Sequence, residues 1–408
     1  MEASFLDILR CPFCGTRLTL VDNSALVRRG SEIESGVLGC ECCAFPIVDG
    51  IPVLIASDRV RDAMHQLESG EPNAALYTLL ELDGERLNAF KRFRARDGGT
   101  YREGLKILSV DAEAEYFVYR FSDPTFRVAR AVVLATGPAL QRGGRYLDLC
   151  GGSGHLVRSM MSDQRAVLAD VYFWKLWLAK HFVAPYCEPV CCDANNPLPF
   201  ARGTFSLVAL SDAFPYIWHK RLLADEMMRL AGPDGTIVMP HLHSSLGENF
   251  TAGMPLTPAA YHDLLEPHHP RLFRDSALFE DVLRGVIDLS HDEPPEALSG
   301  EPALVVVASH HDEIFRETTL PDVLPAPDTV IVNPLYSIDV RGSESVLTLT
   351  FPTPDYEEEF AAAKRYLPST VTIPGDVRQG IDRSAIGEDR YRELCRNLVL
   401  IAAPERYA

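Results

Sequence analysis

The chain has 408 residues, of which 47% are hydrophobic, and a formal net charge of −18. This length predicts two or three domains, and no stretch approaches the roughly 20 apolar residues of a membrane helix. The acidic balance disfavours a nucleic-acid partner, because such partners usually meet a basic face. The N-terminus lacks the basic and apolar regions of a secretory signal. We therefore expect a cytoplasmic protein whose cysteines are reduced thiols or metal ligands.

Two cysteine pairs lie near the N-terminus, in Cys11-Pro-Phe-Cys14 and Cys40-Glu-Cys-Cys43. Each pair can form a tight knuckle, and two knuckles provide four sulfurs at the corners of a tetrahedron, as structural zinc requires. The spacing predicts a zinc site made by Cys11, Cys14, Cys40 and Cys43. Cys42 is a neighbouring thiol that could replace Cys43, and four unligated core cysteines are the alternative. A metal would supply much of the folding energy of so small a unit.

The residues around these cysteines carry a family resemblance. The segments Leu6–Cys14, Leu38–Cys43 and Phe45–Leu54, the last reading FPIVDGIPVL, resemble small zinc-ribbon proteins that activate tRNA, rRNA and translation-factor methyltransferases. One-domain bacterial members of that family share the PI-x-DGIPVL ending. The resemblance covers residues 1–60 and implies a ribbon that binds and stabilises a methyltransferase without doing chemistry itself.

Residues 61–140 are predicted to form a helical cap or linker, because their apolar residues recur at helical intervals. The basic run Lys91–Arg96 is more typical of a solvated helix face than of an anion or RNA contact. Ser122-Asp-Pro-Thr125 is typical of a helix start. Tyr116 and Tyr119 could line an acceptor pocket, although core packing is the favoured interpretation.

Strands and helices alternate from residue 145 onward, which indicates a doubly wound α/β fold with a mostly parallel sheet. The helices are expected at 154–161, at 222–230 and between the second strand and Phe182, which the helix includes. The strands are expected at 145–150, 165–170, 188–193, 204–211 and 235–240.

Three features fall at the carboxyl ends of the first three strands, where such a sheet binds its ligand. The first is the glycine loop Asp148-Leu-Cys-Gly-Gly-Ser-Gly154, whose glycines let backbone approach a ligand closely. The second is Asp170, which could accept both hydroxyls of a ribose. The third is Asp193, before Ala194, which could accept from an adenine amino group. A glycine loop alone would also suit a nicotinamide-dependent oxidoreductase, and the two acids disfavour that reading.

Together these features resemble the class I S-adenosylmethionine-dependent methyltransferases over residues 140–245. The family commonly has glycine where this chain has Cys150. The resemblance implies a Rossmann-like methyltransferase core and a set of residues that contact S-adenosylmethionine. That set is Asp148, Cys150, Gly152, Gly154, Asp170, Asp193, Ala194 and Ser211.

A methyl acceptor is expected near the ends of the fourth and fifth strands, and a hydroxyl acceptor usually needs a base there. His219, His241 and His243 are the candidate catalytic residues, and a structural histidine is the alternative for each. The segment Asp212-Ala-Phe-Pro-Tyr216 is not the Asp/Asn-Pro-Pro-Tyr motif of many nucleobase methylators, which weakens a nucleobase substrate.

The apolar runs 302–309 and 397–403 are predicted to complete the core sheet, with an α+β insertion between them. The expected domains are a zinc ribbon at 1–60, a helical cap at 61–140, a methyltransferase core at 141–310, and the insertion with a final core strand at 311–408. The favoured function is methyl transfer from S-adenosylmethionine to an oxygen or nitrogen of a small-molecule or peptide acceptor. A tRNA or rRNA methyltransferase and a non-catalytic cofactor-binding adaptor are the alternatives.

Overall fold

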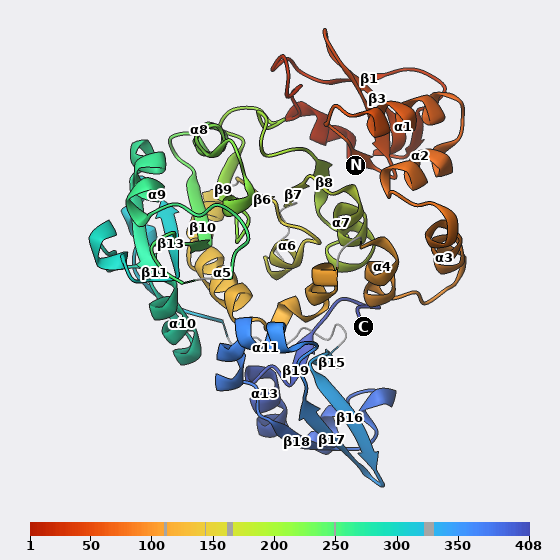
Figure 1. Cartoon of the computed structure of the whole chain (residues 1–408). Helices are drawn as coiled ribbons and strands as arrows, with labels where there is room; N and C mark the ends of the chain where they lie inside the picture. Colours follow the sequence, from red (N-terminus) through yellow and green to blue (C-terminus); the bar gives the residue numbers. More distant parts are fainter. Residues whose placement is uncertain (110–111, 143, 161–165, 249, 322–329) are drawn as a thin grey trace.

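The computed structural model describes the chain except residues 110–111, 143, 161–165, 249 and 322–329 (Figure 1). A central sheet carries helices on both faces, the N-terminal ribbon packs at one end of it, and a C-terminal unit of strands and short helices lies beside it. Among the described residues, no helix is both long and apolar enough to cross a membrane.

The core sheet has seven strands in the order β11-β13-β10-β9-β6-β7-β8. The five from β10 to β8 pair in parallel, whereas β13 is antiparallel to both of its neighbours. This arrangement confirms the predicted doubly wound, mostly parallel α/β fold. Chain order reverses between β6 and β9, which is where such sheets bind ligands. The strands are β6 (Arg145–Leu149), β7 (Val167–Asp170), β8 (Glu188–Cys191), β9 (Phe205–Ala209), β10 (Thr236–His243), β11 (Pro270–Arg274) and β13 (Ala303–Ala308).

Two hydrophobic cores form because successive residues of each strand point to opposite faces. Val167 belongs to the core covered by α8 and α9, and Leu168 belongs to the core covered by α5, α7 and α10. Burial on both faces explains the continuous apolar runs of the central strands. The helices are α1 (Asp58–Glu68), α2 (Pro72–Leu79), α3 (Gly84–Ala95), α4 (Tyr101–Leu108), α5 (Pro124–Ala135), α6 (His155–Ser159), α7 (Phe173–Leu178), α8 (Lys220–Ala231), α9 (Pro258–Leu265), α10 (Asp275–Arg284), α11 (Pro354–Glu359), α12 (Arg383–Ile386) and α13 (Glu388–Arg396).

The ribbon continues the core sheet past its last strand. Val53 forms a parallel bridge with Cys191 of β8, and the Leu54 amide donates to the Cys191 carbonyl at 2.7 Å. Leu9 forms a further bridge with Phe200. The ribbon and one face of the sheet thus share a single hydrophobic core. Its strands are β1 (Thr19–Val21), β2 (Val27–Arg29), β3 (Glu32–Gly39), β4 (Ala44–Val48) and β5 (Ile51–Pro52).

Asp49 and Gly50, in the segment FPIVDGIPVL, lie where the ribbon contacts α7 and the residues that follow it. The Asp49 carboxylate accepts from Trp177 Nε1 and lies 2.7 Å from His181 Nε2. Lys180 Nζ donates to the Asp49 carbonyl at 2.5 Å. Burial opposes ionisation, but His181 and Lys180 hold the pKa of Asp49 below its usual value. Gly50 has φ of 70°, and an added Cβ would lie 2.8 Å from the Met1 backbone nitrogen, so a side chain does not fit.

The C-terminal unit corrects one prediction about the sheet. The run 397–403 forms β19 (Leu400–Ala402), which pairs with β15 (Val330–Val332) outside the core sheet. The last place in the core sheet belongs to β11 instead, which lies at the sheet edge and has arginines on either side of the buried Leu272 and Phe273. The other strands of this part are β12 (Val286–Asp288), β14 (Glu317–Thr319), β16 (Tyr336–Arg341), β17 (Glu344–Leu349) and β18 (Thr370–Pro374).

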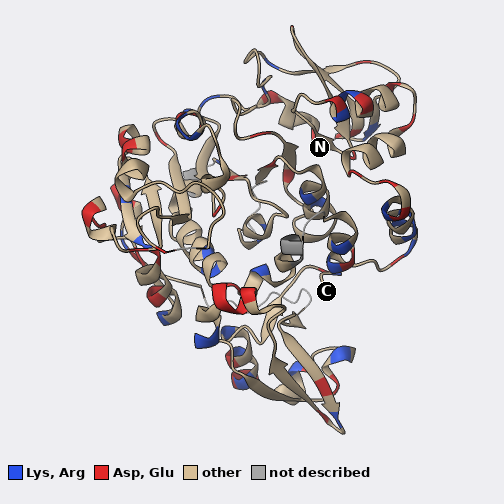
Figure 2. Cartoon of the chain, in the orientation of Figure 1, with Lys and Arg blue, Asp and Glu red and all other residues tan. Residues whose placement is uncertain are grey.

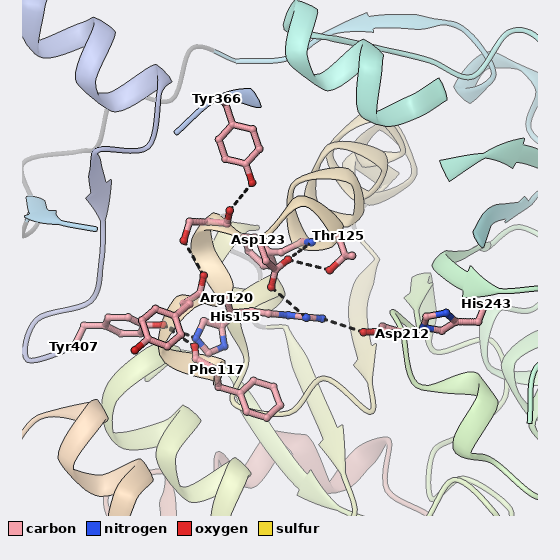
Figure 3. A network of polar contacts seen from close by, with 12 residues as sticks. Phe117, Arg120, Asp123, Thr125, His155, Asp212, His243, Tyr366 and Tyr407 are labelled. Atoms are coloured by element: carbon pink, nitrogen blue, oxygen red, sulfur yellow. Dashed lines mark hydrogen bonds and ion pairs between the residues drawn. The ribbon is translucent and has the colours of Figure 1, made fainter. Parts of the chain in front are cut away.

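The C-terminal segment returns to the core and buries Tyr407, which is 1% exposed. Its hydroxyl lies 2.8 Å from His155 Nε2 and donates to the Phe117 carbonyl at 3.1 Å (Figure 3). Its ring stacks on Tyr101 at 5.0 Å between centroids. Burial, the largest cause, lowers the pKa of His155 to about 3, so this histidine is neutral. Tyr407 therefore ties the C-terminal segment to the start of α6.

We expect Tyr407→Ala to lower the free energy of unfolding by about 3–5 kcal/mol, as for other buried aromatic truncations. Tyr407→Phe keeps the ring and removes the hydroxyl, so it should cost about 1–3 kcal/mol. Urea unfolding followed by fluorescence measures both. Equal losses in the two variants would contradict the packing role of the ring.

Candidate functional site

Four cysteine sulfurs of the ribbon lie within 4.8 Å of one another. The Sγ–Sγ distances are 3.8 Å between Cys11 and Cys42, 3.7 Å between Cys14 and Cys40, and 3.7 Å between Cys40 and Cys42. A tetrahedral zinc with Zn–S bonds of about 2.3 Å places its sulfurs about 3.8 Å apart. The group therefore has the dimensions of a single tetrahedral zinc site.

The structure groups Cys42, rather than the favoured Cys43, with the other three cysteines. The Cys43 amide lies 3.3 Å from Cys40 Sγ and supports it, as the Phe13 amide supports Cys11 Sγ at 3.4 Å. The turn is thus one residue tighter than the usual spacing indicates. Cys43 then leads directly into β4, and its side chain packs against the ribbon core.

The glycine loop follows β6 and lies against the end of β7. The Gly152 amide donates to Asp170 Oδ2 at 3.0 Å, and the Tyr172 amide donates to Oδ1 at 2.9 Å. Gly152 and Gly154 have φ of 58° and 77°, as the prediction of a close turn requires. Sequence reasoning missed Gly151, where an added Cβ would lie 2.5 Å from Asp148 Cγ.

Asp148 is buried at the end of β6 and is 1% exposed. Its Oδ2 atom has no hydrogen-bond partner among the described residues. Burial, helped by the neighbouring Asp170 charge, raises the pKa of Asp148 to about 7. Two carboxyl groups at one loop favour a ligand that carries positive charge there.

The remaining predicted cofactor residues lie at the same end of the sheet. Asp193 follows β8, and its carboxylate accepts from the Asn195 amide and the Asn196 side chain, both at 2.9 Å. Ala194 is buried, and Ser211 follows β9 and is half-buried. Asp193 is thus already engaged in its own turn, whereas Asp148 keeps an unpaired oxygen.

Asp212, His241 and His243 form a second cluster at the ends of β9 and β10. Figure 3 shows Asp212 beside His243. His243 Nε2 lies 3.2 Å from Asp212 Oδ1, and His243 Nδ1 is buried with no partner among the described residues. His241 Nδ1 lies 3.2 Å from Asp275. One ligand atom from each of the three residues lies within 4.8 Å of the others, so the cluster offers either a base or a cation site. Sequence reasoning missed Asp212 because it treated the segment only as a mismatched motif.

Strained backbone marks this end of the sheet. Cys150, Asp212 and His241 have φ of 58°, 57° and 53°, the left-handed region that residues other than glycine rarely adopt. The pairing register of β10 also shifts between Met239 and Leu242, on either side of His241. Each such residue costs about 1–3 kcal/mol and persists only where its surroundings require it. These residues lie in the loops after β6 and β9 and within β10.

Arg120 connects this cluster to the helices that cover it. Its Nη1 lies 3.3 Å from Asp123 Oδ2, and its Nη2 lies 3.9 Å from Asp212 Oδ2 (Figure 3). Asp123 caps α5 by accepting from the Phe126 amide at 2.6 Å. Burial opposes ionisation, but the hydrogen bond from His243 and the charges of Arg120 and the histidines hold the pKa of Asp212 below its usual value. Asp212 is therefore a carboxylate that can orient His243.

The pKa of His241 is raised to about 9, because the Asp275 and Asp212 carboxylates outweigh burial. A raised folded-state pKa stabilises the fold fully below the unfolded value of about 6.5, and this stability is lost as pH rises through about 9. We expect His241→Gln to remove this contribution. The free energy of unfolding of the variant should therefore change less between about pH 6.5 and about pH 9 than that of the intact protein. Urea unfolding at several pH values tests this, and an unchanged pH dependence would contradict it.

His219 is not brought to this cluster. It is exposed, and its Nδ1 lies 2.7 Å from the Asn195 carbonyl, so it joins the turns after β8 and β9. Tyr116 and Tyr119 pack edge-on against Tyr356 of α11, in line with the favoured core interpretation. In the Lys91–Arg96 run, side chains bond to neighbouring helices, as Arg94 does to Asn73.

Exposed apolar side chains rim the loops that follow Asp212 and His243. Trp218 is 75% exposed. The Gly253 loop packs against Pro215, and Met254 N donates to the Pro215 carbonyl at 2.9 Å. The other large exposed apolar residues of these loops are Tyr216, Leu246, Phe250 and Met254. The cluster thus lies next to loops that carry exposed apolar side chains.

Comparison with known proteins bears on the ribbon. No family model matches the chain. A UPF0434 protein from Azotobacter vinelandii is 38% identical over 58 residues, which span 14% of this chain and 80% of that protein. The N-terminal part of the chain belongs to the UPF0434 family. This match confirms the family resemblance predicted for the N-terminal segment, and it places UPF0434 sequence around the four-cysteine group.

Solved structures resemble part of the chain only loosely. One chain of a complex between the Haloferax volcanii Trm112 methyltransferase activator and the putative methyltransferase matches 42% of this chain and 87% of its own length, at 16% identity and a TM-score of 0.31. A SAM-dependent methyltransferase from Aquifex aeolicus covers 42% and 88%, at 14% identity and a TM-score of 0.29. At these TM-scores the likeness carries no inference about activity.

Proposed function

We propose that this protein is an S-adenosylmethionine-dependent methyltransferase with a built-in zinc ribbon. One observation carries the proposal: the glycine loop, Asp170 and Asp193 converge at the carboxyl ends of three adjacent parallel strands. Cys11, Cys14, Cys40 and Cys42 hold the zinc, and the ribbon stabilises the sheet through its contact with β8.

The residues at the loop fit the chemical parts of this cofactor. Asp170 offers a carboxylate to ribose hydroxyls, and its neighbours Val171 and Tyr172 are 43% and 49% exposed, which suits an adenine ring. The unpaired Oδ2 of Asp148 suits a positively charged group, and the cofactor carries an ammonium and a sulfonium. Gly151 and Gly152 keep this place free of side chains.

The bound cofactor supplies a methyl group activated by sulfonium, and the chain must position an acceptor and remove its proton. Asp212 accepts a hydrogen bond from His243 Nε2–H. This leaves the lone pair on His243 Nδ1 to take a proton from an acceptor hydroxyl or amine. A base is favoured over a cation site because Arg120 already neighbours Asp212 and Asp275 already engages His241.

A small molecule or a peptide is the acceptor that we favour, with transfer to oxygen or nitrogen. The exposed apolar rim around Trp218 supports an acceptor with an apolar part. The net charge of −18 disfavours a tRNA or rRNA substrate. The side-chain contacts that hold the Lys91–Arg96 run on the helix surface point the same way.

Calorimetry with S-adenosylmethionine tests the cofactor assignment. We expect the intact protein to bind it and Asp170→Ala to bind about a hundredfold more weakly, because a carboxylate with two ribose hydroxyls is lost. Asp62→Ala, an exposed change on α1, is the matched control. Unchanged affinity in Asp170→Ala would sink the assignment.

The acceptor class is tested by incubating the protein with methyl-labelled cofactor and an extract. The label should appear in small molecules or peptides and persist after ribonuclease treatment. Label confined to RNA would replace our favoured acceptor with the RNA alternative.

A further inference from the structure

A cavity of about 860 Å³ lies between α5, α6, α10, α13 and β19. Six arginines line it, and no aspartate or glutamate occurs among its described lining residues. The chain as a whole has 57 acidic and 39 basic residues, so composition does not explain this concentration. In Figure 2, basic segments are visible on the helices around the junction of α5, α10 and α13. The six are Arg127, Arg130, Arg158, Arg284, Arg365 and Arg396.

Two of these arginines lack a compensating charge. Arg127 and Arg130 lie one turn apart on the same face of α5. The Arg127 guanidinium lies 4.1 Å from the centroid of the Tyr366 ring, and its Nη1 is buried without a partner among the described residues. Burial lowers the pKa of both arginines, and for Arg130 the charge of Arg127 adds to it. No ion pair with a described residue offsets either charge.

The other four arginines have ordinary structural roles. Arg158, Arg284 and Arg396 lie in the last turns of α6, α10 and α13, where positive charge complements the helix dipole. Arg365 forms an ion pair with Glu280. These four contribute positive potential to the cavity. Among the described residues, no carboxylate forms an ion pair with Arg127 or Arg130. These two positive charges therefore favour a bound anion.

We propose that this cavity binds a small phosphate-bearing molecule, with Arg127 and Arg130 as its anchors. Guanidinium groups present parallel N–H donors that match phosphate oxygens, and buried pairs of this kind are strong. The cavity volume lies in the range of about 300–1,000 Å³ that holds small ligands. Apolar residues such as Phe121, Leu283 and Leu400 supply the rest of the wall.

The cavity adjoins the polar network of the candidate base. The Tyr366 hydroxyl donates to the Ser122 carbonyl at 2.5 Å, next to Asp123, and Asp123 contacts Arg120 (Figure 3). In the cavity, the Arg127 guanidinium lies over the same Tyr366 ring. The proposed phosphate site is therefore distinct from the glycine loop. It is connected to the second cluster through Tyr366 and the Asp123–Arg120 ion pair. This inference does not rest on the proposed methyltransferase activity.

Titration calorimetry of the full chain with pyrophosphate, at constant ionic strength, tests the proposal. We expect binding to the intact protein and about tenfold or greater weakening in Arg127→Met and in Arg130→Met, because each loses a charge-assisted contact. Arg378→Met removes an exposed arginine paired with Asp376 and is the matched control. Equal affinity in all four proteins would overturn the proposal.

A stability measurement separates a ligand anchor from a structural residue. Methionine removes a buried, unbalanced charge, so without ligand Arg130→Met should unfold at the same or a higher temperature than the intact protein. Pyrophosphate should raise the unfolding temperature of the intact protein and not of the variant. Arg130→Lys keeps the positive charge but loses the paired N–H donors of the guanidinium, so it should bind pyrophosphate weakly. A destabilised Arg130→Met together with unweakened binding in Arg130→Lys would contradict the anchor role. Binding of RNA without binding of pyrophosphate would replace the small ligand with RNA.

Discussion

Replacing Cys42 with serine is expected to remove zinc from the ribbon, whereas replacing Cys43 is expected to leave it bound. Cys42 Sγ lies within 3.8 Å of two other sulfurs of the group, whereas Cys43 Sγ contacts Cys42 Sγ at 3.3 Å but does not join the four-sulfur group. The apparent binding free energy of structural zinc in small domains is about 10–16 kcal/mol, so loss of the metal unfolds them. Because the ribbon shares its core with the sheet, Cys42→Ser should also lower the stability of the whole chain.

Metal analysis of purified protein checks this expectation, with about one zinc per chain in Cys43→Ser and almost none in Cys42→Ser. Thermal unfolding of the two variants gives the second readout. The pair is a matched control because the two cysteines are adjacent and both are changed to serine. Retained zinc in Cys42→Ser with loss in Cys43→Ser would restore the assignment that spacing alone favours.

His243→Gln is expected to reduce kcat by about 10²–10⁴-fold, the usual contribution of a positioned base. Asp212→Asn should reduce it as well, since a neutral amide no longer stabilises the positive charge that His243 gains when it takes a proton. Affinity for S-adenosylmethionine should stay unchanged in both variants, because the glycine loop and Asp170 are left intact.

His219→Gln serves as the histidine control, since His219 is exposed and bonds to the carbonyl and the side chain of Asn195. The measurement is a methyl-transfer assay under saturating cofactor, with its pH profile. A profile that keeps its acid limb in His243→Gln would show that another group takes the proton, and equal loss in His219→Gln would remove the special role of His243.

Sequence patterns predicted the strands that are buried on both faces, because such strands are unbroken apolar runs. β13, whose six residues are all buried, is an example. They missed β11, since Pro270–Arg274 contains two arginines and lies at the edge of the sheet. The run 397–403 is equally apolar but pairs with β15, so hydrophobicity could not tell which sheet it joins.

The candidate site was predictable where a residue follows a strand and unpredictable where contacts cross the fold. Asp170 falls at the end of β7 and was found from its position alone. Asp212, Arg120 and Asp275 meet the histidines through segments far apart in sequence, and no local pattern marks them. Cys42 replaced Cys43 because of one tight turn, which spacing rules do not resolve.

The bridge between Val53 and Cys191 has a consequence for solubility. A terminal parallel strand with free backbone groups is a template on which another chain can pair, and proteins protect such strands. Here the ribbon occupies that side of β8, and the ribbon in turn depends on its four sulfurs. Stripping the metal should therefore expose β8 and promote aggregation of the whole chain. In this respect the ribbon also protects the protein against self-association.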